Sequence, residues 1–102
     1  MVSVGEFYCG VAAVGAGSSL EVKPGANEQY ILFAVGDPTQ TEVYLTDGVN
    51  DSLVWQPYMT PVVGTQLAIP FLKIGFNHDC WISIKNIAGG GINLSFSCIR
   101  VK

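Results

Sequence analysis

Apolar and polar residues alternate with a period of two in three segments of the chain, residues 42–46, 81–85 and 92–98. In residues 81–85, for example, two isoleucines alternate with tryptophan, serine and lysine. This period places successive side chains on opposite faces of a β-strand. Helices are not expected, because no long stretch carries apolar residues at helical spacing without glycine or proline. The three segments are therefore predicted to be half-buried strands.

Turn-forming residues divide the rest of the chain at regular intervals. The clearest are the Pro-Gly-Ala-Asn of residues 24–27, the Gly-Asp-Pro of 36–38, the Asp-Gly-Val-Asn of 47–50, the Phe-Asn-His-Asp of 76–79 and the three glycines of 89–91. Such residues favour turns because they accept positive φ or preset the backbone. The β-branched and aromatic segments between the turns predict about eight strands: residues 6–14, 20–23, 29–35, 42–46, 52–57, 66–73, 80–85 and 92–101.

Short strands separated by regular turns are typical of an all-β fold. We expect a single β-sandwich, jelly-roll-like, of about eight antiparallel strands. A chain of 102 residues is long enough for one domain. Within it, residues 1–19 are expected to form an N-terminal arm and first strand that contacts a neighbouring molecule, and residues 20–102 the sandwich itself.

Two features of the strands depart from simple alternation. Residues 30–35 and 67–74 are apolar on both faces, which predicts a second layer over them. In so small a chain, we expect that layer to be another subunit. In the last strand the apolar positions shift by one residue, to Ile99 and Val101, which predicts a bulge or a change of neighbour near residues 98–100.

Charged residues make up only 13% of the chain and hydrophobic residues 49%, whereas an ordinary soluble domain has about 25% charged residues. Much of the surface must therefore be neutral or buried against another molecule. The net charge of −3 and the scattered basic residues argue against nucleic-acid binding. The apolar runs are far shorter than the about 20 residues of a membrane span. The first residues do not resemble a signal peptide, so we expect assembly in a cytoplasm.

The three cysteines are Cys9, Cys80 and Cys98. An odd number cannot close into a disulfide framework. Free, buried thiols are the favoured interpretation, and a disulfide between Cys80 and Cys98 across neighbouring strands stays open. His78 lies two residues before Cys80, but a histidine in a turn and a cysteine on the inward face of a strand are favoured over a catalytic dyad. No cysteine spacing fits a zinc site.

Other candidate chemistry is weak. Asp47, Asn50 and Asp51 bring three oxygen ligands together, but without the spacing of a calcium loop, so aspartates that cap their own turns are favoured. The glycines of residues 89–91 lack the lysine that follows in a phosphate-binding loop. We therefore expect no enzyme activity, no cofactor and no metal. Exposed aromatic residues such as Trp81 favour a protein interface over a carbohydrate platform.

Four segments resemble small structural proteins of tailed bacteriophages. They are Lys-Pro-Gly-Ala-Asn-Glu-Gln-Tyr-Ile at 23–31, Glu-Val-Tyr-Leu-Thr-Asp-Gly-Val-Asn at 42–50, Trp-Ile-Ser-Ile-Lys-Asn at 81–86 and Ile-Arg-Val-Lys at 99–102. The resemblance implies a virion β-sandwich, a capsid decoration (cement) protein that binds the major capsid protein or another virion protein. It also implies a homotrimer that stabilises the phage head, located in the virion, without catalytic residues. Low charge and strands that are apolar on both faces suit a subunit of a symmetric assembly.

We expect the interface in the N-terminal segment, residues 2–14, and at two exposed aromatic residues. The candidates are Val2, Val4, Phe7, Tyr8, Val11, Val14, Tyr44 and Trp81. Deletion of residues 1–10 is expected to abolish binding to the particle without unfolding the domain. The alternative function is a carbohydrate- or receptor-binding module of a phage tail or fibre, with Trp55, Tyr58 or Trp81 against the glycan.

Overall fold

A computed structural model describes residues 2–36, 40–56 and 73–102 of the chain. These residues contain β-strands and no α-helix. The strands are β1 (Phe7–Val14), β2 (Ser19–Val22), β3 (Gln29–Val35), β4 (Thr41–Thr46), β5 (Asp51–Trp55), β6 (Ile74–Asn77), β7 (Trp81–Asn86) and β8 (Ile92–Arg100).

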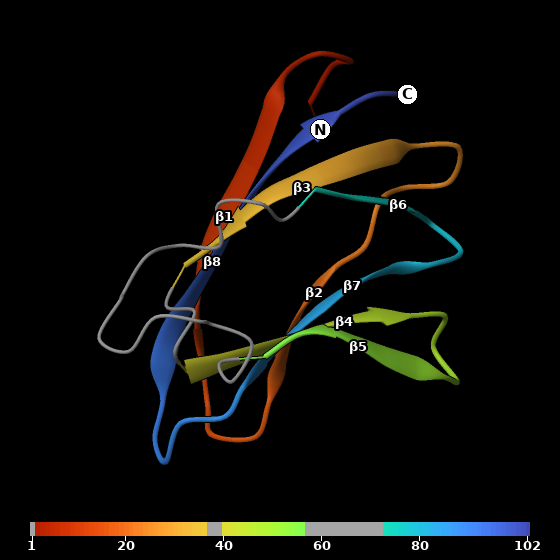
Figure 1. Ribbon diagram of the computed structural model, residues 1–102. Coiled ribbons are helices and arrows are strands. Elements are labelled where there is room, and N and C mark those ends of the chain that lie inside the picture. Colours follow the sequence, from red (N-terminus) through yellow and green to blue (C-terminus); the bar gives the residue numbers. More distant parts are fainter. Residues whose placement is uncertain (1, 37–39, 57–72) are drawn as a thin grey trace.

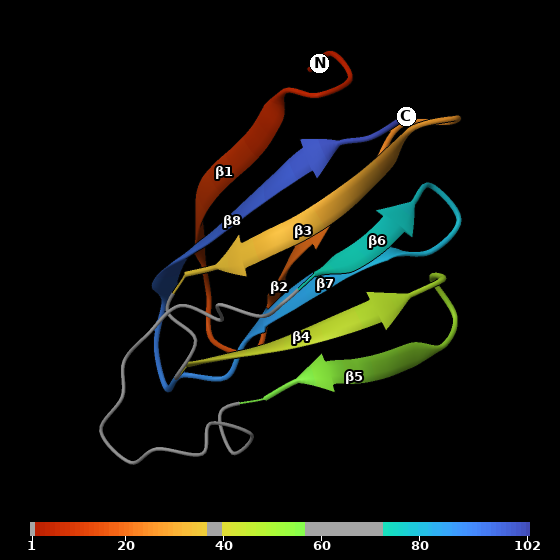
Figure 2. The ribbon, with the colours of Figure 1, turned by 45° about the horizontal axis from the view of Figure 1, so that its top comes forward.

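The strands form two antiparallel sheets that pack face to face (Figures 1 and 2). The first sheet has the order β1-β8-β3-β6, and the second sheet has the order β2-β7-β4-β5. Apart from the β4–β5 hairpin, successive strands alternate between the two sheets. This is the strand order of a jelly roll, in which eight strands form two Greek keys. The prediction of an all-β sandwich of about eight antiparallel strands is confirmed.

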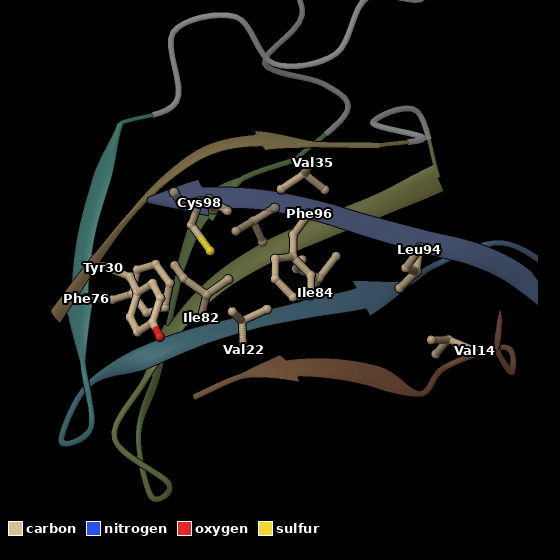
Figure 3. Packing of buried hydrophobic residues seen from close by; sticks show 12 residues of the cluster. Val14, Val22, Tyr30, Val35, Phe76, Ile82, Ile84, Leu94, Phe96 and Cys98 are labelled. Atoms are coloured by element: carbon tan, nitrogen blue, oxygen red, sulfur yellow. The ribbon is translucent and has the colours of Figure 1, made fainter. Parts of the chain in front are cut away.

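The alternation in the sequence explains which side chains fill the space between the sheets. In β7 of the second sheet, Ile82 and Ile84 point inward and are fully buried, and in β8 of the first sheet Leu94 does the same. Figure 3 shows these side chains converging from both sheets. The rest of the buried hydrophobic cluster comprises Val14, Val22, Tyr30, Leu32, Val35, Val43, Phe76, Phe96 and Cys98. Full burial of each large aliphatic side chain contributes about 1.5–3 kcal/mol.

β1 contributes to this core as well as forming an edge of the first sheet. Gly10 lies opposite Phe96 of β8, and a Cβ at Gly10 would come within 2.9 Å of the Phe96 ring. Only glycine leaves room for that ring. Tyr8 packs on the same side, with its ring centroid 5.3 Å from that of Phe96. Part of the segment expected to act as an N-terminal arm and first strand, residues 7–14, is thus a strand of the sandwich.

Arg100, the last residue of β8, ties both ends of the described chain to the sandwich. Its Nη1 donates a hydrogen bond to the carbonyl oxygen of Val2 at 2.7 Å, and its Nε donates to the carbonyl oxygen of Lys102 at 3.0 Å. The same guanidinium lies 3.6 Å from Oε2 of Glu28. The ends of the chain are therefore held by contacts within the chain itself.

Asn86, the last residue of β7, has a corresponding role in joining separate parts of the sandwich. Its side chain is fully buried, and its Nδ2 donates to the carbonyl oxygens of Val14 and Gly90, each at 2.9 Å. Its Oδ1 accepts the backbone N–H of Ala88 at 2.8 Å. Asn86 belongs to the second sheet and Val14 to the first, so this side chain joins the two sheets.

The turn before β7 differs from its prediction. Phe76 and Asn77, predicted in a turn, are the last residues of β6. The turn follows because Oδ1 of Asn77 accepts the backbone N–H groups of Asp79 and Cys80, both at 2.9 Å. Cys80 was expected on the inward face of a strand, but it is exposed in this turn. Nearly all of the predicted strand at residues 66–73 lies outside the described residues.

The irregularity expected near residues 98–100 of β8 lies in its neighbour instead. β8 keeps an unbroken register with β1, and its pairing with β3 shifts at Phe33, the extra residue of a bulge in β3. The phase shift in the sequence of β8 has a different cause. Ile99 lies on the outer face of the sheet, whereas Arg100 pairs with the inward-facing Tyr30 and reaches Glu28.

Candidate docking surface

β1 exposes more large apolar side chains than any other described strand. Phe7 is 70% exposed and Val11 is 73% exposed. Cys9 and Ala13, on the same face of the strand, are exposed as well. The four share a face because alternate residues of a strand point to the same side. They form one edge of the outer face of the first sheet.

The whole outer face of the first sheet is uncharged in the described strands. Beside β1, the outer positions of β8 and β3 are Asn93, Ser95, Ser97, Ile99, Ile31 and Ala34. The one charged residue in the sequences of the four strands is Arg100. It reaches between the sheets toward Glu28. Within the described strands this face is therefore neutral, and along β1 it is apolar.

The outer face of the second sheet is charged. Each of its strands carries one charged residue: Glu21 in β2, Lys85 in β7, Glu42 in β4 and Asp51 in β5. Lys85 pairs directly with Glu42 in the register of β4 and β7. Opposite charges on neighbouring strands favour the native register, and they keep this face hydrated.

Aromatic side chains of the second sheet are already engaged by these carboxylates. Nε1 of Trp81 donates to Oε1 of Glu21 at 3.1 Å, and the hydroxyl of Ser83 donates to the other oxygen of Glu21. The hydroxyl of Tyr44 donates to Glu42 at 2.8 Å. This bond, together with partial burial, raises the pKa of Tyr44.

A cation covers the Trp81 ring as well. Nζ of Lys23 lies 4.1 Å from the centroid of the Trp81 ring, which is the geometry of a cation–π contact. Both the polar edge and one face of this indole are therefore occupied by groups of the same chain.

The structure divides the eight predicted interface residues between two separate regions. Val4, Phe7, Tyr8 and Val11 are exposed at β1 and just before it, and Val2 is half-buried against the core. Tyr44 and Trp81 are partly buried on the outer face of the second sheet. Val14 must be removed from the set, because it is only 8% exposed and belongs to the core.

A pocket of about 450 Å³ opens at the end of the sandwich where Arg100 lies. Its buried carboxylate, Glu28, accepts the N–H of Gly25 at 3.0 Å and the hydroxyl of Tyr30 at 3.2 Å. Burial and the negative charge of Glu28 raise the pKa of Tyr30. Because donors of the same chain already bind this carboxylate, the arrangement stabilises the end of the sandwich.

His78 and Cys80, the two residues considered as a catalytic dyad, show no contact of that kind in the structure. His78 and Cys80 are both exposed in the β6–β7 turn, and Nδ1 of His78 lies 3.0 Å from the carbonyl oxygen of Pro24. The imidazole is thus bound to the backbone of the β2–β3 connection, which it helps to hold in place.

Of the residues considered as calcium ligands, Asp47 and Asn50 lie in the β4–β5 turn and Asp51 begins β5. Oδ1 of Asp47 accepts the N–H of Val49 at 2.9 Å and that of Asn50 at 2.7 Å, and these bonds lower the pKa of Asp47. Gly48 has a φ of 93°, a value that favours glycine. Within residues 2–36, 40–56 and 73–102, no three His, Cys, Asp or Glu side chains come together as metal ligands.

The three cysteines occupy different environments. Cys98 is fully buried and its thiol donates to the carbonyl oxygen of Tyr8 at 3.3 Å. Burial raises the pKa of Cys98 to about 12. Cys9 and Cys80 are exposed, which corrects the expectation of buried thiols. Cys80 precedes β7 of the second sheet, so it does not face Cys98 across neighbouring strands.

Sequence reasoning missed the segregation of charge between the sheets. The signal was present, because each strand of the second sheet contains a charged residue, whereas β1, β3 and β6 contain none. It becomes visible only when the strand order is known, since neighbours in the sequence lie mostly in different sheets.

No protein-family model, no curated protein and no solved structure matches the chain. In the part of the chain that the structure describes, no helix has the length and apolar character needed to cross a membrane.

Proposed function

We propose that the protein is a structural component of a virion, a capsid decoration protein that binds the phage head through the outer face of its first sheet. The single observation that carries this proposal is the neutral character of that face, with Phe7 70% and Val11 73% exposed at its edge. A jelly roll by itself does not specify a function, because the same fold serves many. The resemblance of the sequence to small phage structural proteins supplies the kind of partner.

The energetics of such a surface favour docking to another protein. Burial of a large apolar side chain such as Phe7 contributes roughly 1.5–3 kcal/mol. No charged group on the outer face of the described strands of the first sheet has to lose its hydration, so these strands add no desolvation cost of a buried charge. The serines and asparagine of β8 can exchange water for polar groups of the partner at little cost.

The test uses a matched pair of substitutions, one on each sheet. Ser97→Asp places a carboxylate in the middle of the first sheet's outer face, and Ser19→Asp places one on the second sheet opposite Lys85. Both variants change the net charge equally. They are expressed with the other virion proteins of the same virus, and particles are banded in a density gradient. We expect the wild-type chain and Ser19→Asp to band with the particles, and Ser97→Asp to lose at least about tenfold occupancy.

Two results contradict the proposal: absence of the wild-type chain from the particle band, and equal occupancy of the two variants. These substitutions are a cleaner test than deletion of residues 1–10. The deletion removes Tyr8 and Gly10, which pack against Phe96 in the core, so loss of binding after it has two explanations.

A glycan-binding module of a tail or fibre is the second candidate, and the aromatic residues of the second sheet with their carboxylates favour it. Trp81 lies on the outer face of this sheet, whereas Trp55 pairs with the inward-facing Val43 of β4, so these two do not form one platform. Tyr58 lies outside the described residues. A glycan array tests this candidate: a specific signal that Trp81→Ala removes supports it, and an array without signals removes it.

A further inference from the structure

Among the described strands, the sandwich has four edge strands, and these differ in how well they resist pairing with another strand. β2 and β6 have four residues each and β5 has five. β2 and β5 also carry a carboxylate, Glu21 and Asp51 respectively. β1 has eight residues, without a charge or a proline. Short length, charge and proline are the usual devices that prevent edge strands from pairing, and β1 has none of them.

The backbone of β1 alternates between its neighbour and the open edge. The N–H of Arg100 in β8 donates to the carbonyl oxygen of Glu6 at 3.1 Å, so even-numbered residues direct their polar groups toward β8. In an antiparallel ladder the intervening residues direct theirs the other way. Phe7, Cys9, Val11 and Ala13 therefore present N–H and C=O groups at the edge of the sheet. Figure 2 shows β1 (red) at this edge, with β8 as its neighbour on the other side.

We propose that two copies of the chain pair through β1, antiparallel and about a two-fold axis, to form one continuous eight-stranded sheet. The absence of charged residues in β1 favours a second copy of the chain over a different partner. Close to a two-fold axis a residue lies near its own counterpart, so a charged residue in the middle of the strand would approach a like charge. β1 has no charged residue and is therefore self-complementary in charge.

The geometry also selects a register. The axis keeps outer side chains on the outer face, so odd-numbered residues of β1 must pair with odd-numbered residues. Centring the axis on Gly10 pairs the large Phe7 with Ala13 of the second copy, and Cys9 with Val11 of the second copy. Each large side chain then lies beside a smaller one, and residues 7–13 all take part.

Such a pair would double the docking surface without adding a charge to it. The outer faces of the two first sheets become continuous across the axis. The two copies of β1, which carry Phe7 and Val11, are the middle strands of the combined sheet. A pairing of edge strands buries less than the about 800 Å² per partner of a standard interface. We therefore expect a dissociation constant in the micromolar range, and a dimer that the presence of a larger assembly would reinforce.

Mass in solution tests the pairing without any particle, so its result is independent of the proposed virion role. Light scattering behind a sizing column is measured from about 1 µM to about 1 mM, which spans the affinity expected of a small interface. The wild-type mass should rise from 10.9 kDa to twice that value. Val11→Lys should stay monomeric throughout. The control Val49→Lys, at a valine that is 87% exposed in the β4–β5 turn, should dimerise like the wild type.

Oxidative crosslinking then tests the proposed register between the two copies of β1. In a Cys80→Ser background, Val11→Cys places a new thiol opposite Cys9 of the second copy. We expect a disulfide-linked dimer on a non-reducing gel, and no such dimer from the control Ala13→Cys. A disulfide in the control but not in Val11→Cys overturns the register centred on Gly10.

Three results overturn the pairing itself: a wild-type monomer at every concentration, a dimer that Val11→Lys leaves intact, and a trimer. The trimer would agree with the three-fold assembly that the resemblance to phage proteins implies. Thermal unfolding followed by circular dichroism confirms that both lysine variants are folded before their masses are compared.

Discussion

The two sheets of the sandwich are alike inside and different outside. Their inner faces both contribute buried hydrophobic residues to one core, such as Leu32 in the first sheet and Ile84 in the second. On the outside, the second sheet has one charged residue on every strand, while the first has none. Stability thus depends on both sheets, but only one presents a surface that another protein can cover without desolvating a charge. The hydrophobic inner face is shared by the two sheets, and the neutral outer face belongs to the first sheet alone.

The largest expected effect tests the equivalence of the inner faces. Leu32→Ala in the first sheet and Ile84→Ala in the second each remove a fully buried side chain. Each should lower the free energy of unfolding by about 2–5 kcal/mol, because a cavity remains where the side chain was. Urea unfolding measures both. If one variant is as stable as the wild type, the two inner faces are not equivalent.

The next effect compares the two faces of the first sheet through their cysteines. Cys9 lies on the outer face and Cys98 on the inner face. Burial of the Cys98 thiol raises its pKa from 9.0 to about 12. The thiolate is the reactive form, so Cys98 should react roughly 1000-fold more slowly than a free thiol at pH 8. A thiol reagent with mass spectrometry should modify Cys9 and Cys80 quickly and Cys98 only after unfolding.

The same pKa has a consequence for stability. The pKa of Cys98 is raised in the folded state, so the folded state holds this proton more tightly than the unfolded state does. Its contribution is fully present below pH 9.0 and is lost as the pH rises toward about 12. Cys98→Ala should be less sensitive to pH in this range than the wild type. Rapid labelling of Cys98 at pH 8 in the folded protein would contradict both expectations.

The smallest effect compares the outer faces. Glu21→Ala removes the acceptor of both Trp81 and Ser83 and should lower the stability by about 1 kcal/mol. Val11→Ser changes an exposed side chain without such partners and should alter the stability of the monomer by less than about 0.5 kcal/mol. Urea unfolding at low protein concentration measures both, and tryptophan fluorescence should shift only for Glu21→Ala. A larger loss for Val11→Ser would show that the outer face of β1 stabilises the fold.

Much of the fold was predictable because the polarity of a side chain indicates whether its position in a strand is buried or exposed. The period of two in β4, β7 and β8 follows directly from one dry and one wetter face, and the residues on the dry face are those found in the core. The strand β6 was misplaced because phenylalanine and asparagine stand next to a turn. Asn77 both ends the strand and caps the turn that follows.

The candidate site was predictable only in part. The exposed Phe7 and Val11 came from residues 2–14, which the sequence indicated as an interface. Trp81 and Tyr44 were expected to be available in the same way, but Glu21, Glu42 and Lys23 already contact them. Glu42 lies two residues from Tyr44 on the same face of β4. Glu21 and Lys23 lie in β2 and directly after it, and the local sequence pattern does not show that β2 pairs with β7.

The sequence alone determined that the chain forms a sandwich of β-strands with few charges, since periodicity and composition are local properties that each segment carries by itself. The tertiary structure decided where those few charges lie. Alternate strands enter different sheets, so pairing over long sequence separations places Glu21, Glu42, Asp51 and Lys85 together on one outer face. It leaves the other face neutral and leaves β1 at its open edge.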